Sequence, residues 1–199
     1  INQSAAVTCV KPSGTVSQLV DSASGIHARH NPYYIRTVRA DKKDPLAKAM
    51  VEAGFPVEDD VMKPEHTYVF SFPMKANPEA VFRTDKTAVE QLELWLKYQK
   101  HWCEHKPSVT ISVKEHEWME VGNWCYENFD ELSGISFLPF SDHSYRQAPY
   151  QDCSEEEYEE FRKKMPIDVN WKELLANYEF SDMTEGAQEL ACVAGGCEI

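Results

Sequence analysis

The sequence predicts an α/β fold in which short strands alternate with helices. Short apolar runs alternate with segments whose apolar residues recur every three to four positions. Such alternation favours parallel strands joined by crossover helices, and strands that are apolar throughout are typical of burial on both faces. With 42% hydrophobic and 27% charged residues, the 199-residue chain has the composition of one or two globular domains.

Strands are expected where apolar or β-branched residues cluster between turn signals. These runs lie at residues 5–10, 33–38, 67–72, 108–113 and 135–139. Pro73 is expected to end the third of them. The strands are too few to close a barrel, and an independent sheet of this size would leave an edge exposed. Since the chain also begins at a strand without an initiator Met, we expect it to be one arc of a larger barrel.

Helices are expected where apolar residues follow the 3.6-residue period. They lie at residues 16–20, 45–53, 85–99, 115–132, 155–164 and 171–178. Gly54 should end the second helix, Thr84 or Asp85 should cap the third, and Ser154 should cap the fifth. The five tryptophans fall on helix stripes and are expected in the core. Residues 186–199 show no periodicity and are expected to form a tail.

Charge and hydropathy exclude two classes of function. The net charge is −13, which argues against a general nucleic-acid binder because phosphate neutralisation needs a basic face. Residues 151–199 carry 13 acidic and 4 basic residues, a net −9 that is typical of a solvated helix and tail. Apolar runs fall short of a membrane span, and no signal peptide is present, so we expect a cytoplasmic protein with no membrane partner.

The six cysteines do not resemble a secreted disulfide framework, because they are too sparse for the chain length. Cys9, Cys103 and Cys125 are expected to be small core residues. Cys192 and Cys197 differ, because four small residues including two glycines separate them near the C-terminus. An accessible, flexible pair of this kind suits thiol–disulfide exchange. A structural metal pair, which would need two further ligands, and an accidental pairing remain alternatives.

The segment Lys-Pro-Ser-Gly-Thr-Val-Ser at residues 11–17 lies between a predicted strand and a predicted helix. A glycine among hydroxyl residues at such a turn exposes backbone N–H groups, which together suit an anion such as phosphate. The segment is not a Walker A loop, because the Gly-Lys-Ser/Thr ending is absent. An ordinary helix cap remains the alternative.

Two further patterns carry weaker signals. His101 and His105 are one helical turn apart and could face a metal, but no second pair accompanies them, so a polar helix end is the simpler interpretation. His27 and His30 are a weaker instance of the same pattern. Tyr33 and Tyr34 could stack, but packing within a strand is the favoured interpretation.

Several of these segments together resemble the adenosylcobalamin-dependent (class II) ribonucleotide reductases, of the monomeric ribonucleoside-triphosphate reductase type. The resemblance covers nearly the whole chain in order. Its motifs are Lys-Pro-Ser-Gly-Thr-Val-Ser-Gln-Leu (11–19), Ser-Gly-Ile-His (24–27), Pro-Tyr-Tyr-Ile-Arg-Thr-Val-Arg (32–39), Lys-Pro-Ser-Val-Thr-Ile-Ser-Val (106–113), Gly-Ile-Ser-Phe-Leu-Pro (134–139), Gln-Ala-Pro-Tyr (147–150) and Glu-Leu-Ala-Cys-Val-Ala-Gly-Gly-Cys-Glu-Ile (189–199).

The resemblance implies the C-terminal part of a ten-stranded α/β barrel with the active site inside. Residues 1–150 would be the barrel arc, 151–185 an acidic helical extension, and 186–199 a redox-active tail. It implies that a loop binds the phosphates of a ribonucleoside di- or triphosphate, and its residues here are Pro12, Ser13, Gly14, Thr15, Val16 and Ser17. It also implies that Cys192 and Cys197 reduce an active-site disulfide and are then reduced by thioredoxin or a similar donor.

Other parts of that family have no counterpart in the sequence. No segment matches the finger loop that carries the thiyl-radical cysteine, and the allosteric region and the barrel redox cysteine are also absent. The strand at 135–139 lacks the tyrosine dyad of the diiron enzymes, which favours class II. The chain alone is therefore expected to be inactive without the N-terminal remainder of the enzyme. A non-catalytic phosphate-binding module, the complementing half of a split reductase, and a free-standing thiol–disulfide protein remain alternatives.

Overall fold

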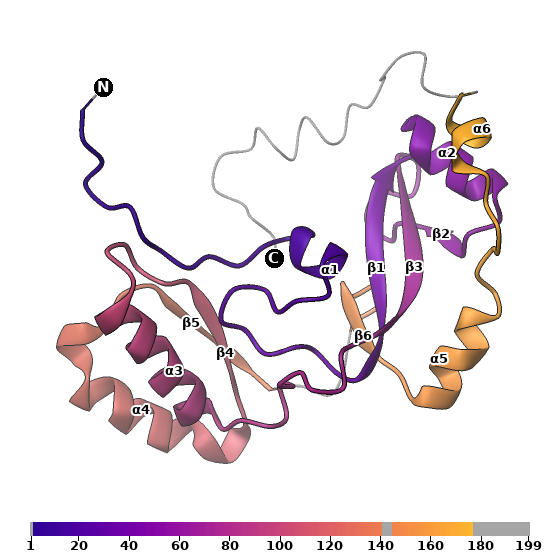
Figure 1. Cartoon of the computed structure of the whole chain (residues 1–199). Helices are drawn as coiled ribbons and strands as arrows, with labels where there is room; N and C mark the ends of the chain where they lie inside the picture. The colour runs from indigo at the N-terminus through magenta and orange to yellow at the C-terminus, as the bar shows by residue number, and fades with distance from the viewer. Residues whose placement is uncertain (1, 141–144, 177–199) are drawn as a thin grey trace. The chain divides into compact units, whose positions relative to one another are not determined.

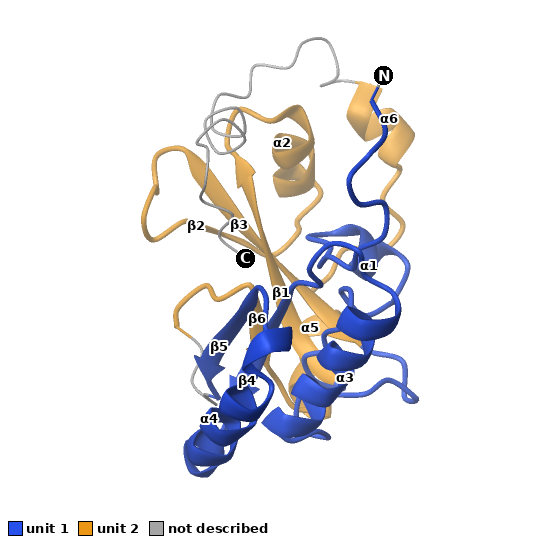
Figure 2. Ribbon diagram, turned by 90° about the vertical axis from the view of Figure 1, so that its left-hand side faces the viewer, with its two compact units in different colours: residues 1–32, 76–142 blue, residues 33–75, 143–199 orange. Residues whose placement is uncertain are grey.

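A computed structural model describes residues 2–140 and 145–176 (Figure 1). The chain divides into two compact units, residues 1–32 with 76–142 and residues 33–75 with 143–199, which Figure 2 shows in separate colours. Each unit has its own sheet. The mixed α/β class predicted from the sequence is confirmed, but the strands do not form one parallel sheet. None of the helices in the described ranges is long and apolar enough to cross a bilayer.

The first unit is built on two parallel strands, β4 (Val109–Val113) and β5 (Ile135–Pro139). Between them the chain runs through a short 3₁₀ turn (Glu115–Glu117), helix α4 (Trp118–Glu127) and a second 3₁₀ turn (Phe129–Glu131). The predicted crossover is therefore confirmed, although the predicted single helix at 115–132 is broken into three pieces.

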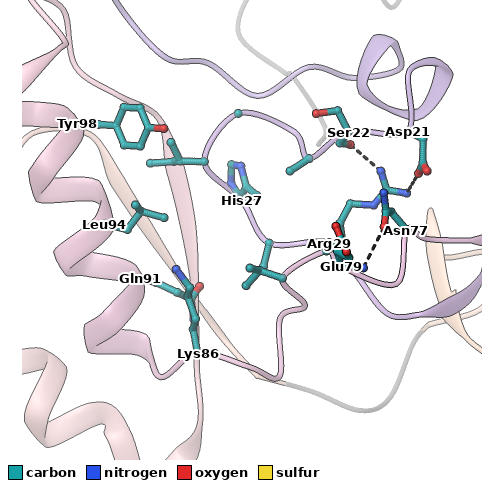
Figure 3. A pocket seen from close by; sticks show the side chains of 16 residues that line it. Asp21, Ser22, His27, Arg29, Asn77, Glu79, Lys86, Gln91, Leu94 and Tyr98 are labelled. Carbon is teal, nitrogen blue, oxygen red and sulfur yellow. Dashed lines mark hydrogen bonds and ion pairs between the residues drawn. The ribbon is translucent and has the colours of Figure 1, made fainter.

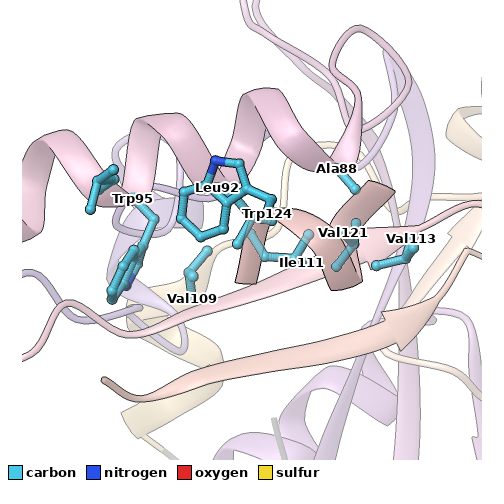
Figure 4. Packing of buried hydrophobic residues seen from close by; sticks show 9 residues of the cluster. Ala88, Leu92, Trp95, Val109, Ile111, Val113, Val121 and Trp124 are labelled. Atoms are coloured by element: carbon cyan, nitrogen blue, oxygen red, sulfur yellow. The ribbon is translucent and has the colours of Figure 1, made fainter. Parts of the chain in front are cut away.

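Helices α3 (Ala88–His101) and α4 pack with strand β4 to form the hydrophobic core of the first unit (Figure 4). The buried cluster comprises Ala88, Leu92, Trp95, Leu96, Val109, Ile111, Val113, Val121 and Trp124. The alternate residues of β4 point into this cluster, as the alternating burial of that strand requires. The expectation that all tryptophans are core is wrong, because Trp102, Trp118 and Trp171 are each at least 40% exposed.

Helix α3 begins three residues later than predicted. Thr87 is its N-cap and forms a capping box with Glu90, in which each side chain accepts a hydrogen bond from the other residue's backbone N–H. Asp85 instead accepts a hydrogen bond from the Phe82 N–H in the preceding turn. Several residues before the helix have side chains that can cap it, and the path of the backbone decides which one is the N-cap.

The strand predicted at residues 5–10 is absent. The segment instead lies beside the irregular stretch after α3, where the carbonyls of Thr8 and Val10 accept from the N–H groups of His105 and Ser108. Glu104 accepts from the N–H groups of Val7 and Thr8. No continuous ladder forms, because the neighbouring stretch is itself not a strand. Cys9 is exposed here and is not a core residue, whereas Cys103 and Cys125 are half-buried.

The second unit contains a four-stranded antiparallel sheet in the order β2-β3-β1-β6. Its strands are β1 (Tyr33–Asp41), β2 (Val57–Asp59), β3 (Thr67–Lys75) and β6 (Tyr150–Asp152). The prediction of parallel pairing is wrong here, because the chain returns after α2 (Pro45–Glu52) and pairs β3 with the full length of β1 in reverse. The two three-residue strands were missed because so short a segment carries no periodic signal.

Pro73 does not end β3 as predicted but lies within it, opposite Ile35 of β1. The N–H of Ser71 points away from β1 and donates to the carbonyl of Pro56. Pro73 is two residues further along, so the position of its missing N–H faces the same side of the strand. β2 does not extend that far. A proline is tolerated there because the strand has no ladder partner on that side.

Helices α5 (Glu155–Arg162) and α6 (Trp171–Ala176) complete the described part of the second unit. Ser154 caps α5 through a capping box with Glu157, as the sequence predicted. Tyr33 packs against Tyr158 of α5, while Tyr34 is buried against Tyr150. Tyr33 thus packs against a helix and Tyr34 against a neighbouring strand, so their ring partners are different residues.

Candidate functional site

The predicted phosphate loop at residues 12–17 leads into a single-turn helix, α1 (Val16–Leu19), in the first unit. The loop is anchored at its start by Lys11, whose Nζ donates to the Ser108 Oγ at 2.7 Å and to the Lys106 carbonyl at 3.2 Å. Both acceptors lie just before or at the start of β4. The beginning of the loop is therefore tied to the sheet of its own unit.

Three consecutive backbone N–H groups of the loop have no hydrogen-bond partner among the described residues. They belong to Gly14, Thr15 and Val16, all of which are exposed. Thr15 is the N-cap, but its side chain makes no capping bond. Because unpaired N–H groups at a turn attract an acceptor, this arrangement suits the anion expected from the sequence.

Ser13 and Ser17 give the loop its internal geometry. The Ser13 Oγ accepts from the Ser17 N–H at 3.1 Å, which closes the turn over the three free N–H groups. Ser17 is only 5% exposed, and its own hydroxyl has no hydrogen-bond partner among the described residues. A buried hydroxyl without a partner is unfavourable, so a ligand that supplied one would relieve that cost.

Gly14 is not required by its backbone conformation, because its φ angle lies outside the left-handed region. A Cβ built at Gly14 would meet no heavy atom within 4 Å. The space beside the Gly14 backbone is open, which agrees with the expected approach of a ligand. Pro12 is half-buried and precedes the exposed part of the loop.

The loop is held from outside by the turn at residues 22–27. The Ser24 Oγ accepts from the Ser13 N–H and donates to the Ser13 carbonyl, both at 2.8 Å. The Nδ1 atom of His27 lies 2.7 Å from the Ser24 carbonyl, and its Nε2 atom accepts from the Thr110 N–H of β4 at 3.0 Å. The turn therefore connects the loop to strand β4.

A cavity of about 500 Å³ opens on the other side of this turn, within the first unit (Figure 3). Its wall includes His27, Lys86, Leu94 and Tyr98. On the opposite side lies Arg29, which is 5% exposed and donates to Asp21 at 2.8 Å and to the Ser22 carbonyl at 2.7 Å. Arg29 thus holds the segment that follows α1.

Sequence reasoning assigned the loop but missed Lys11, Ser24 and His27 as the residues that position it. All three lie in motifs that carry the resemblance, residues 11–19 and 24–27, but those motifs gave them no role, and the spacing of His27 and His30 suggested a metal pair. Both ring nitrogens of His27 instead form hydrogen bonds with backbone groups of the protein. Among residues 2–140 and 145–176, no three His, Cys, Asp or Glu side chains gather in a way that could hold a metal ion.

The second predicted site, Cys192 and Cys197, lies outside the described residues. Among the described cysteines, Cys153 is half-buried at the end of β6. Burial, followed by the nearby carboxylates of Glu157 and Asp152, raises the pKa of the Cys153 thiol to about 11. This thiol is protonated at neutral pH and is a poor nucleophile.

Known proteins of one kind are similar to this chain over nearly its whole length. It is 32% identical over 200 residues to the adenosylcobalamin-dependent ribonucleoside-triphosphate reductase of Euglena gracilis, covering 99% of this chain and 27% of that protein. The enzyme of the same name from Lactobacillus leichmannii is 29% identical over 204 residues, covering 100% of this chain and 27% of that protein. No protein-family model matches the chain.

The fold gives the same result. The crystal structure of a B12-dependent (class II) ribonucleotide reductase superposes with a TM-score of 0.70 at 28% identity, over 85% of this chain and 24% of that one. The chain is therefore homologous to a segment of the class II ribonucleotide reductases. Within that class, its relatives are the adenosylcobalamin-dependent ribonucleoside-triphosphate reductases, and it spans about a quarter of their length.

Proposed function

We propose that the chain acts as the C-terminal portion of a cytoplasmic, adenosylcobalamin-dependent ribonucleotide reductase. The complete enzyme would reduce ribonucleoside di- or triphosphates to 2′-deoxyribonucleotides by a radical mechanism. Similarity to such enzymes along the whole chain supports this proposal. The 199 residues contain no match to the finger loop of the thiyl-radical cysteine, so the chain alone should not catalyse the reaction.

The loop at residues 12–17 would bind the phosphates of the substrate. The observation that carries this part is the row of three unpaired N–H groups at Gly14, Thr15 and Val16. Phosphate oxygens accept hydrogen bonds from such groups and from serine and threonine hydroxyls. The unpartnered, buried Ser17 hydroxyl and the open space at Gly14 support the same role.

Cys192 and Cys197 would act as a thiol–disulfide shuttle. One tail thiolate would attack the active-site disulfide formed at each turnover and give a mixed disulfide. The second tail thiolate would then release the reduced active site and leave a disulfide between the two tail cysteines. Thioredoxin or a similar dithiol would reduce that disulfide and become oxidised itself. The spacing of the two cysteines and the glycines between them support this role.

The described cavity does not fit the cobalamin cofactor. A volume of about 500 Å³ suits a small ligand, whereas a corrin ring with its side chains and nucleotide tail is much larger. We therefore assign no described residue to adenosylcobalamin, which the complete enzyme would hold. Its chemistry when bound is the generation of the initiating radical.

Calorimetry of the full chain with a ribonucleoside triphosphate tests the loop. Gly14→Val should weaken binding by on the order of 3 kcal/mol, because it blocks the approach to two or three charge-assisted hydrogen bonds. Gly122→Val is the matched control, since a Cβ at Gly122 also meets nothing within 4 Å. Equal affinity in the wild-type and Gly14→Val chains would contradict the assignment.

Complementation with a front half that carries the finger-loop cysteine distinguishes a reductase from a binding module. Deoxyribonucleotide formation that requires both halves would support the reductase. Nucleotide binding without any reduction in the complemented mixture would instead support a non-catalytic phosphate-binding module.

A further inference from the structure

We propose that His27 is a positioning residue that sets the place of the phosphate loop relative to strand β4. This inference rests on the proposed phosphate-binding function and adds to it the residue that determines the loop geometry. His27 lies outside the loop at residues 12–17, and its ring bonds to Ser24 and Thr110. It acts through Ser24 on one side and is held by Thr110 on the other.

The two neighbours of the His27 ring require one protonation state. The Ser24 carbonyl oxygen, 2.7 Å from Nδ1, can only accept, so Nδ1 must carry a proton. The Thr110 N–H can only donate, so Nε2, 3.0 Å away, must present a lone pair. The ring is therefore neutral, with its proton on Nδ1. In this form the ring joins two backbone groups that are 86 residues apart in sequence.

Ser24 transmits this connection to the loop. Its hydroxyl both accepts from the Ser13 N–H and donates to the Ser13 carbonyl, so one side chain determines the orientation of both peptide groups of Ser13. The Ser13 hydroxyl in turn accepts from the Ser17 N–H. An unbroken series of hydrogen bonds thus runs from β4 through His27 and Ser24 to the turn that displays the free N–H groups.

The series of hydrogen bonds ends at Thr110 of β4, which is held in the sheet beside the core of the unit. Ile111, next to Thr110, is fully buried in the core of the unit, and Thr110 itself pairs with Ser136 of β5. The loop end has the opposite character, because Gly14, Thr15 and Val16 are exposed and unpaired. His27 therefore connects the sheet to a segment whose three N–H groups have no partner among the described residues. Preorganised N–H groups bind an anion with a smaller entropic cost.

A double-mutant cycle on the full chain tests the inference, with inorganic triphosphate as the calorimetric probe. His27→Ala and Ser24→Ala should each weaken binding about tenfold, and the double variant should be no weaker than either single one, because both break the same series. His105→Ala is the control, since that side chain is exposed and only its backbone is bonded. Fully additive losses would overturn the inference.

Two further variants separate positioning from general stability. His27→Gln can present an amide oxygen near the Nε2 position, and His27→Asn can present an amide N–H near the Nδ1 position. Each should recover part of the affinity lost in His27→Ala. If both unfold at the same denaturant concentration as His27→Ala and bind just as weakly, the hydrogen bonds of the ring do not position the loop.

Nuclear magnetic resonance gives a readout that does not depend on any ligand. The ¹⁵N shifts of the His27 ring should report a neutral imidazole protonated at Nδ1. His27→Ala should shift the amide signals of Ser13 and Ser17 and leave that of Trp95 unchanged. An unchanged Ser13 amide would overturn the inference even if triphosphate binds.

The two proposals can fail separately. If the wild-type chain binds no triphosphate but His27→Ala still shifts the Ser13 amide, the phosphate function is wrong and the positioning role holds. If Gly14→Val abolishes binding while His27→Ala and Ser24→Ala do not weaken it, the phosphate function holds and the positioning role is wrong.

Discussion

Gly25 lies so close to Lys11 that a Cβ added to it would stand 3.0 Å from the Lys11 carbonyl oxygen. Gly25 also has a φ angle of +61°, a conformation that L side chains rarely adopt. The turn that carries Ser24 and His27 thus packs directly on the residue at which the candidate loop begins. Two independent constraints require glycine at this one position.

We therefore expect Gly25→Ala to destabilise the first unit. The left-handed conformation alone costs an alanine about 1–2 kcal/mol, and the contact with Lys11 adds to that. Urea unfolding followed by tryptophan fluorescence measures the change. Gly122→Ala is the matched control: it lies in helix α4 with open space around it, and it should stabilise by about 0.5–1 kcal/mol. Equal stability of the two variants would contradict the geometry at Gly25.

Ser17→Ala should change affinity and stability in different directions. Without ligand, the variant loses a buried hydroxyl that has no described partner, so its stability should be unchanged or slightly higher. With triphosphate, it should bind several-fold more weakly, because a donor to the phosphate is gone. Thermal unfolding with and without triphosphate compares the two effects. A variant that is less stable than wild type in both conditions would show that the hydroxyl has a structural role.

The buried carboxylate of Asp60 should make the second unit sensitive to acid. Burial works against its charge, but the Arg39 Nε at 2.7 Å and the N–H groups of Lys63 and Met62 hold the pKa of Asp60 below its ordinary value of 3.8. Because the folded pKa is the lower one, Asp60 stabilises the fold above its unfolded pKa. That contribution is lost as the pH falls through the folded value.

Asp60→Asn should accordingly lower the free energy of unfolding near neutral pH and flatten its decline in acid. Denaturant unfolding at a series of pH values measures both. Asp59→Asn is the control, because the Asp59 pair with Lys42 is on the surface and contributes little. If the stability of Asp60→Asn falls in acid as steeply as that of wild type, Asp60 does not cause the acid sensitivity.

Cys153 should react slowly with thiol reagents. With a pKa of about 11, on the order of one thiol in a thousand is ionised near pH 8, and only the thiolate reacts. Mass spectrometry after brief treatment with iodoacetamide should find Cys9, which is exposed, modified before Cys153. Comparable modification of both cysteines would contradict the protected state of Cys153.

Cys192→Ser should abolish turnover of the complemented enzyme when thioredoxin is the reductant. The tail would then have no pair of thiols to pass electrons to the active site. A small dithiol that can enter the active site should still support turnover, which separates loss of the shuttle from loss of the fold. Normal turnover with thioredoxin would exclude the shuttle role of Cys192 and Cys197.

Local patterns in the sequence predicted most of the helices and longer strands. The capping box at Ser154 and the apolar alternation of β4 identify their elements because the interacting atoms are within a few residues of each other. The same local rules gave wrong predictions where an element depends on a segment that is distant in the sequence. The strand at residues 5–10 had the right composition but no regular neighbour, and Pro73 was tolerated only because β2 ends before reaching it.

The turn at residues 12–17 could be predicted for the same reason, since the hydrogen bond that closes it joins Ser13 to Ser17, four residues apart. Sequence alone therefore determined the α/β class and the relationship to a reductase segment. Only the tertiary structure decided that the larger sheet is antiparallel and that His27 reaches Thr110, 83 positions away. Periodicity and capping act within a few residues, whereas strand pairing and the environment of a side chain depend on which distant segments the folded chain brings together.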